Sequence, residues 1–575
     1  MATGEDSAND QLMMPELQVD RSPSRLRHVR TAGFMAAAAA VAFMWLDDRA
    51  GWLDYQPGGT AFFTYVRPVF YGMFLVGSVV AIKWEIAGGA IGAFAAGAIG
   101  AIVVNQLVTA DALIVIALLA VPAALWVLAD LLAWTRRTAA IGFAVAIAAV
   151  AAGVGTGEYV YERSFGPTHP ASSVEPLPDS LVRWVWSGAV TATGAEIVTR
   201  TERDDVDELR LALVTGDASF DSAPRFVPVA RRDGELASFI VDELEADTRY
   251  RYAVEVDGRL DTVRTGAFTT FPTGPASFTF TVGSCARVGS NGAVFDAVRS
   301  EEPLVHLIAG DFHYGDIPDD ERDRYDEVID LTLRQPAQSA LYRSTPIAYM
   351  WDDHDYGVND SSASSASRLA AMDAYRANVP SYPLADPLSP VYQRFDVGRV
   401  RFLLTDARSG REDGVTMLGD DQLAWLLDEL VVAADEQALV VWLNPVPWVA
   451  DAEPGADSWA GYADERQLIA DTIARHEIDN LLMVSGDAHM VAIDDGSNTD
   501  FSSTGGAGFP LIHAAALDRP GSTKGGPYSH GAVGGGGQYA VVEVTDDGGE
   551  IRVALRAKRW DGEIVLAYDF TVPSD

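Results

Sequence analysis

Four short groups of polar residues between Cys285 and His489 have the side chains that metal chemistry requires. They lie at residues 283–285, 310–316, 351–355 and 486–489, and together they offer carboxylates, imidazoles, one thiol and one phenol. Such a mixture of hard and soft ligands, gathered in motifs rather than spread along a helix face, indicates a metal cluster rather than a solvated surface.

Each group follows an apolar run of strand length, at 278–282, 304–309, 347–350 and 481–484. Side chains placed just after buried parallel strands lie at one edge of the sheet, where α/β folds build their sites. The spacing therefore predicts that the four groups meet at one such edge.

The elements around these runs alternate between strands and helices. We expect helices at 292–300, 320–342, 366–376, 419–433 and 463–476, a hairpin around Gly398, and closing β segments at 538–544, 551–557 and 564–572. This order is typical of two sheets flanked by helices. The Gly- and Ser-rich run 502–537 predicts a long loop, which in a compact domain is usually functional or disordered.

Residues 181–273 have a different pattern, with short alternating strands separated by turn signals, which predicts a β-sandwich. Within it, residues 244–252 resemble the tyrosine corner of fibronectin type III modules, and 266–270 resemble their last strand. No catalytic set occurs here, so we interpret this domain as a spacer or as a wall of the active-site cleft.

Residues 31–156 predict a membrane region. Apolar runs at 31–46, 62–82, 86–107, 112–134 and 139–155 approach the length that crosses a bilayer, so we expect about five spans after a tail at 1–30 and before a linker at 157–180. A cleaved signal peptide is the alternative for the first run. Paired charges are missing inside the spans, which favours an anchor over a transport pathway.

The basic residues of this region predict its orientation. Four arginines precede the first span, Lys83 lies between the second and third, and Arg136 and Arg137 lie between the fourth and fifth. Since basic residues stay on the cytoplasmic side, the N-terminus is expected inside and everything after residue 157 outside, in an extracellular or periplasmic position.

The remaining chain is strongly acidic. Residues 1–156 hold nine basic and eleven acidic residues, which leaves 33 basic and 70 acidic residues, or −37, for the rest of the chain. That charge excludes a nucleic-acid-backbone binder, which needs a basic surface. With Cys285 as the one cysteine, an intrachain disulfide is excluded as well.

Six motifs in their order resemble the PhoD-like alkaline phosphatases, which have the calcineurin-like metallophosphoesterase fold. They are Cys285, Gly-Asp-x-x-Tyr at 310–314, Trp-Asp-Asp-His-Asp at 351–355, residues 404–409, residues 417–426, and Gly-Asp-Ala-His at 486–489. The resemblance covers 180–575 and implies a metallophosphoesterase domain at 274–575. The fold class is thus multidomain: transmembrane helices, a fibronectin type III-like β-sandwich and an α/β phosphoesterase domain.

The resemblance also implies a centre of at least two metals, Fe³⁺ with Ca²⁺ beside it, although other divalent metals are open. A thiolate and a phenolate suit trivalent iron, and one carboxylate can span two cations, which makes Asp311 the natural bridge. Asp353 stands where related enzymes carry a ligating Asn, and Asn359 is a second candidate for that role. The candidate ligands are Cys285, Asp311, Tyr314, Asp353, Asn359, Asp487 and His489.

Two residues are candidates for the chemistry itself. His354 is the expected general acid, or a cation that holds phosphate. Arg408 is the expected phosphate contact, because a guanidinium binds two oxygens at once, but a structural ion pair is the alternative. We interpret His306 as a core residue, since it lies within a strand, and Asp352 and Asp355 as acceptors that orient ligands.

The sequence therefore predicts a membrane-anchored extracellular phosphoesterase that hydrolyses phosphate monoesters or diesters through a water activated by two metals. Its partners would be the ester substrate and the lipid bilayer. Two alternatives stay open. One is a phosphodiesterase specific for cell-envelope polymers or phospholipids, and the other is a metal-binding ectodomain that acts as a receptor or scaffold without turnover.

Overall fold

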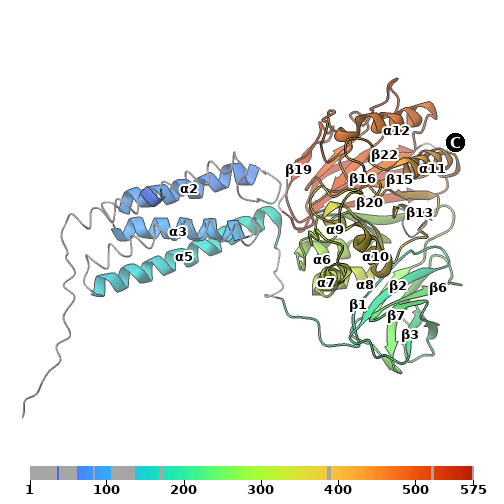
Figure 1. The fold of residues 1–575 in the computed structure, drawn as a ribbon, viewed down its shortest axis with the longest axis horizontal. Coiled ribbons are helices and arrows are strands. Elements are labelled where there is room, and N and C mark those ends of the chain that lie inside the picture. The colour runs from blue at the N-terminus through green and yellow to red at the C-terminus, as the bar shows by residue number, and fades with distance from the viewer. Residues whose placement is uncertain are drawn as a thin grey trace, which may run out of the picture. The chain divides into compact units, whose positions relative to one another are not determined.

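The computed structural model describes residues 35–37, 61–81, 85–104, 136–167, 174–384, 390–519 and 523–572. The chain divides into two compact units (Figure 1). The first consists of Met1–Gln56 and Phe62–Val160, and the second of Pro57–Ala61 and Tyr161–Asp575.

The described part of the first unit is helical, with α2 (Ala61–Ala81), α3 (Glu85–Val104) and the first part of α5 (Arg136–Phe165). Glycines allow these helices to approach closely. A Cβ at Gly77 would lie 2.5 Å from the backbone nitrogen of Gly92, and one at Gly153 would lie 2.0 Å from the carbonyl oxygen of Phe94. Small residues at helix contacts are typical of helices that pack in lipid.

One helix segment among the described residues, Ala140–Arg163, is long and apolar enough to cross a membrane, whereas Val69–Ala81 and Ala87–Ile102 are shorter. The structure thus supports one candidate span and does not support the predicted five. The expected spans at 31–46, apart from 35–37, and at 112–134 lie outside the described residues. The predicted start of the linker at residue 157 is wrong, because α5 continues to Phe165.

The predicted strands of 181–273 are confirmed and form two layers. One contains β1 (Val182–Gly188), β2 (Ala195–Thr201), β6 (Leu236–Val241) and β5 (Arg231–Asp233); the other contains β4 (Arg225–Pro228), β3 (Leu209–Thr215), β7 (Arg249–Val256), β8 (Arg259–Leu260) and β9 (Gly266–Thr269). Tyr250 Oη accepts a hydrogen bond from the Glu245 backbone at 3.0 Å, a contact of the tyrosine-corner kind. The fibronectin type III assignment itself stays a prediction.

This β domain shares a sheet with the domain that follows it. Strand β1 pairs in parallel with β12 (Ile347–Met350) through Gly188 and Ile347, which extends one sheet to ten strands in the order β22-β21-β20-β10-β11-β12-β1-β2-β6-β5. A Cβ at Gly188 would lie 2.7 Å from the carbonyl oxygen of Ile347, so the contact needs glycine. The β domain is therefore joined to the following domain through a shared sheet and is more than a tethered spacer.

The ten-stranded sheet supplies three of the strands that precede polar motifs. Strands β10 (Phe278–Gly283), β11 (Val305–Ala309) and β12 are parallel, and β20 (Gln538–Asp546), β21 (Ile551–Arg559) and β22 (Ile564–Val572) continue antiparallel from β10. Helices α6 (Ala293–Ser300), α7 (Arg322–Leu333), α8 (Pro336–Ser344) and α10 (Arg368–Asn378) accompany it. The helix predicted at 320–342 is two helices, because Pro336 begins α8.

A second sheet has seven strands in the order β13-β14-β15-β16-β18-β17-β19. Their bounds are β13 (Gln393–Val397), β14 (Val400–Leu404), β15 (Leu439–Asn444), β16 (Leu481–Ser485), β18 (Leu511–Ala514), β17 (Met490–Asp494) and β19 (Ala532–Gly534). The prediction of one long loop at 502–537 is wrong, since β18 and β19 lie within it. Helices α11 (Asp420–Glu436) and α12 (Ala463–Arg475) complete the domain.

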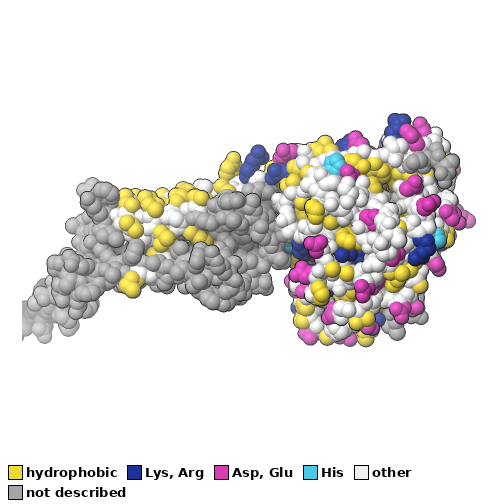
Figure 2. Space-filling view, turned by 90° about the horizontal axis from the view of Figure 1, so that it is seen from above, with side chains coloured by type: hydrophobic (Ala, Val, Ile, Leu, Met, Phe, Trp, Pro, Cys, Tyr) yellow, Lys and Arg dark blue, Asp and Glu magenta, His cyan; other side chains and the backbone are white. Residues whose placement is uncertain are grey.

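The two faces of the seven-stranded sheet belong to different cores. Phe402, Val441 and Val484 belong to the large core that includes the ten-stranded sheet, whereas Trp442 and Met483, on the opposite face, pack with the apolar faces of α11 and α12. Alternation along each strand thus places this sheet between the other sheet and two helices, as predicted. Acidic side chains are scattered over the visible face of the second unit (Figure 2).

Candidate metal centre

The polar motifs meet where the two sheets approach each other. Cys285 and Asp311 follow β10 and β11, Asp353 begins the short helix α9 (Asp353–Tyr356) after β12, and Asp487 follows β16. A Cβ at Gly486 would lie 2.1 Å from the carbonyl oxygen of Ala309, so the ends of β16 and β11 are in direct backbone contact. The expected meeting of motifs at strand ends is confirmed, but two sheets contribute to it rather than one.

Four predicted ligands lie in the left-handed backbone region. The φ angles are 62° at Cys285, 53° at Asp311, 54° at Asp487 and 51° at His489. Residues other than glycine are uncommon there, and such strained positions concentrate at functional sites, where the surrounding structure holds them. The tight turns aim these side chains back across the strand ends.

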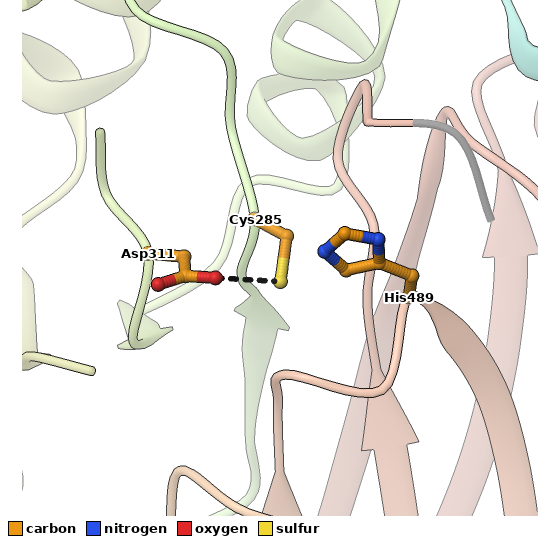
Figure 3. Close-up of side chains that lie close together, drawn as sticks. All are labelled: Cys285, Asp311 and His489. Atoms are coloured by element: carbon orange, nitrogen blue, oxygen red, sulfur yellow. Dashed lines mark hydrogen bonds between the residues drawn. The ribbon is translucent and has the colours of Figure 1, made fainter. Parts of the chain in front are cut away.

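Hydrogen bonds link these ligands to one another. Tyr314 Oη donates to Asp311 Oδ2 at 2.6 Å and lies 2.9 Å from His489 Nε2, and Cys285 Sγ lies 3.5 Å from the same Asp311 oxygen. Figure 3 shows Cys285 between Asp311 and His489, with the three side chains pointing toward one another. All four side chains are buried.

Three groups of side chains present ligand atoms within 4.8 Å of one another: Cys285, Asp311 and His489; Asp311, Asp353 and His354; and Asp353, Asp360 and Asp457. Asp311 belongs to the first and second groups, and Asp353 to the second and third. A carboxylate shared by two groups has the placement that a bridging ligand needs, which fits the role expected of Asp311.

The donor atoms fit metal ions. Asp311 Oδ1 and Asp487 Oδ2 are buried and have no hydrogen-bond partner among the described residues, which is costly for a carboxylate unless a cation compensates; Asp353 Oδ1 also has no hydrogen-bond partner there, but Arg408 lies 3.7 Å away. Burial raises the pKa of Asp311 to about 7 and raises the pKa of the Cys285 thiol well above its usual value. These residues would ionise readily only beside a cation.

Helix α9 orients the histidine next to this cluster. Asp352 and Asp355 form a capping box around its first turn, and Asp355 also accepts a hydrogen bond from the backbone of His313. His354 Nδ1 is hydrogen-bonded to Asp316 Oδ1, and the His354 ring lies 4.2 Å from the Tyr314 ring. Burial lowers the pKa of His354, but the carboxylates around it outweigh burial and raise the pKa to about 10.

Arg408 is fully buried in ion pairs. Its Nε donates to Asp352 Oδ1, and its two terminal nitrogens bind Asp457 Oδ1 and Oδ2 at 2.8 and 3.1 Å. The relative exposure of the side chain is 0%. This geometry favours the structural alternative over the phosphate contact, because both edges of the guanidinium are already occupied by carboxylates.

The remaining candidates divide between the site and the core. Asn359 is exposed, and its neighbour Asp360 joins the cluster instead, with its backbone donating to Asp353 Oδ2 at 2.7 Å. His306 lies in β11 with its ring nitrogen 2.9 Å from Thr281 Oγ1, as a core residue would.

Sequence reasoning assigned no role to five residues of this region: Asp316, Asp360, Asp457, Arg519 and Lys524. Asp316 lies within the polar group at 310–316, whereas the other four lie in irregular segments that no periodic pattern marks. Lysine is rare in the chain, with Lys83, Lys524 and Lys558 as its only occurrences, and this rarity was the one signal that could have drawn attention to Lys524.

Two sheets flanked by helices thus form an α/β domain in which buried carboxylates, a thiol and imidazoles that could hold metal ions meet at the strand ends. Residues 280–525 match the model of the PhoD-like phosphatase family. The matched segment covers less than half of the chain.

Two known proteins are similar to this chain. Alkaline phosphatase D of Bacillus subtilis (strain 168) is 25% identical over 186 residues, which cover 26% of this chain and 32% of the relative. The chain thus matches about a third of the length of that curated protein. A solved structure described as the structure of PhoD covers 70% of this chain and 94% of its own, with a TM-score of 0.53 and 15% identity, and so shows a common fold.

Proposed function

We propose that the chain is a metal-dependent phosphoesterase that hydrolyses phosphate monoesters, diesters or both. The observation that carries the proposal is the buried ligand cluster in which Asp311 is shared by two groups of ligand atoms. Two bound metal ions would supply an acidified water and neutralise phosphate oxygens. The match of residues 280–525 to the PhoD-like phosphatases supports phosphate-ester hydrolysis as the reaction.

The ligand types support iron in the first group and calcium beside it, at the side where Asp353 lies. Cys285 and Tyr314, with His489 beside them, offer thiolate, phenolate and imidazole, whereas Asp353 offers oxygen alone. Softer and redox-active metals take sulfur and nitrogen, and calcium takes oxygen. Asp487, with one buried oxygen that has no partner among the described residues, would complete the pair.

His354 is proposed to donate the proton to the leaving oxygen. Asp316 holds Nδ1, which leaves Nε2 as the nitrogen that can exchange a proton. The same side chain lies in the group with Asp311 and Asp353, so ligation is the competing role. If His354 is the proton donor, the protein without its imidazole keeps its metals, and if His354 is a ligand, the protein loses metal.

The test compares His354→Ala with Asp311→Ala on an alkyl phosphate and on nitrophenyl phosphate. His354→Ala is expected to keep its metals and to lose about 10²–10⁴ in kcat on the alkyl ester, with a smaller loss on nitrophenyl phosphate, whose leaving oxygen needs no proton. Asp311→Ala should lose metal and activity together on both esters. Loss of metal in His354→Ala would instead make His354 a ligand.

We further propose that the catalytic domain is anchored at the cell membrane and faces away from the cytoplasm. The Ala140–Arg163 segment supports one span, and the multi-pass arrangement with a cytoplasmic N-terminus rests on hydropathy and basic residues. A reporter enzyme fused after residue 575 should be active outside the cytoplasm. Cytoplasmic activity of the fusion would exclude this orientation.

A further inference from the structure

The expected phosphate contact, Arg408, has both edges of its guanidinium bound to Asp352 and Asp457. An anionic ester that approaches a cluster of buried carboxylates still needs cationic groups from the protein. Arg411, a cation beside the cluster, is paired with Asp457, but two other cations outside the ligand motifs also lie there. They are Arg519 and Lys524, in the segment that follows β18.

This segment already forms part of the wall of the site. Ala515 and Ala516 are fully buried and pack against Cys285 and Tyr314. The Leu517 backbone donates to the carbonyl oxygen of Ser284 at 2.9 Å, which fixes the segment beside the loop that carries Cys285. Arg519 thus follows an anchored stretch of backbone.

Arg519 stacks on a candidate metal ligand. Its guanidinium carbon lies 3.4 Å from the centre of the Tyr314 ring, and Tyr314 Oη in turn lies 2.6 Å from Asp311 Oδ2. The side chain is 7% exposed, and its Nε is buried with no hydrogen-bond partner among the described residues. A stacked guanidinium keeps its N–H edge available for a planar or tetrahedral oxyanion.

Lys524 approaches from the same segment. Its Nζ donates to Asp487 Oδ1 at 2.7 Å, and its side chain is 37% exposed, so the ammonium group is at the rim of the cluster. An ammonium on a flexible stem can contact a ligand and a bound anion with different hydrogens, since it has three donors.

We propose that Arg519 and Lys524 form the cationic clamp that binds the phosphoryl oxygens of the substrate, and that Arg408 instead positions Asp352 and Asp457. The inference rests on the proposed phosphoesterase function and adds the protein groups that recognise the anion. Arg519 would bind by its N–H edge above Tyr314, and Lys524 from the rim beside Asp487.

The test uses the full chain loaded with metal and measures two quantities: the affinity for inorganic phosphate, by calorimetry, and kcat and KM for nitrophenyl phosphate. Arg519→Met and Lys524→Met are each expected to weaken phosphate binding and to raise KM by roughly 10- to 100-fold, as the loss of a hydrogen bond to a charged group implies. Metal content should stay unchanged. Arg519→Lys should recover part of the lost phosphate affinity, because lysine keeps the positive charge but lacks the planar guanidinium that binds two oxygens.

Matched controls separate the clamp from general charge effects. Arg552→Met removes an exposed arginine and Lys558→Met removes a lysine paired with Glu301 at 2.7 Å, and both should bind phosphate as the parent does. If Arg519→Met and Lys524→Met retain metal and parental phosphate affinity, the clamp is refuted while the proposed function stands. A parent protein that neither binds phosphate nor hydrolyses esters would overturn both.

Discussion

Replacing Arg408 with methionine is expected to destabilise the α/β domain strongly. Arg408 is fully buried, donates to Asp352 Oδ1 through Nε and makes a two-pronged pair with Asp457. Breaking a buried pair by removing one partner costs about 3–5 kcal/mol, because it leaves an uncompensated charge. Asp457 would keep Arg411 as a partner, so most of the cost falls on Asp352.

The size of the loss has a limit that follows from the same geometry. Burial already raises the pKa of Asp352 well above its usual value, even though Arg408 opposes that shift. Without the arginine the carboxyl would take up a proton, and the penalty should therefore approach the lower end of the range, about 3 kcal/mol. The loss of stability should be smaller at acidic pH than at neutral pH, because protonation of the Asp352 carboxyl costs less free energy when the proton concentration is higher.

Urea unfolding followed by tryptophan fluorescence would measure this loss in Arg408→Met and Arg408→Lys. The lysine variant should also lose stability, since lysine keeps the charge but lacks the two terminal nitrogens that bind both oxygens of Asp457. Adding Asp457→Asn to Arg408→Met should not deepen the loss by the full cost of a second broken pair, because the two changes affect one network. Parental stability of Arg408→Met, together with a large rise in KM, would refute the structural role and make Arg408 a phosphate contact.

Two further changes test separate parts of the structure. Cys285→Ser should weaken binding of the proposed iron and, as iron is lost, bleach the visible charge-transfer band. A colourless protein that holds metal and is indifferent to this change would make Cys285 a core residue. Burial lowers the pKa of His306 to about 3, so the unfolded chain binds more protons below pH 6.5, and stability should fall by about 2 kcal/mol between pH 7 and pH 5. His306→Asn, which can keep the contact to Thr281, should remove that part of the acid sensitivity in urea unfolding measured at both pH values.

The strands that precede the motifs were predictable because each is a short apolar run followed by a polar turn. Strand β15 was missed, since only Gln437 and Ala438 separate it from α11 and the join has no Gly or Pro to mark it. Strands β18 and β19 have four and three residues within a Gly-rich stretch, and pairing with β16 and β17 defines them. Such long-range pairing leaves no local signal.

The same distinction separates the predicted from the missed parts of the site. Cys285, Asp311 and His489 were predictable because strand ends place them, whereas Asp457 comes from a loop and reaches Arg408 across 49 residues of sequence. Whether an arginine binds substrate or a carboxylate of its own chain depends on that distant partner. The residue type alone therefore could not decide between the two roles of Arg408.

Backbone conformation is the part of the site that sequence reasoning could least supply. Cys285, Asp311, Asp487 and His489 all lie at positive φ, where each residue costs of the order of 1 kcal/mol or more. Glycine would adopt these turns without that cost but would offer no ligand atom. The chain therefore retains strained residues that can bind metal, and the buried strands β10, β11 and β16 hold the turns in place. Asp311 and Asp487 combine this strain with a buried carboxylate oxygen that has no hydrogen-bond partner among the described residues, and a bound cation would compensate the cost of burying that charge.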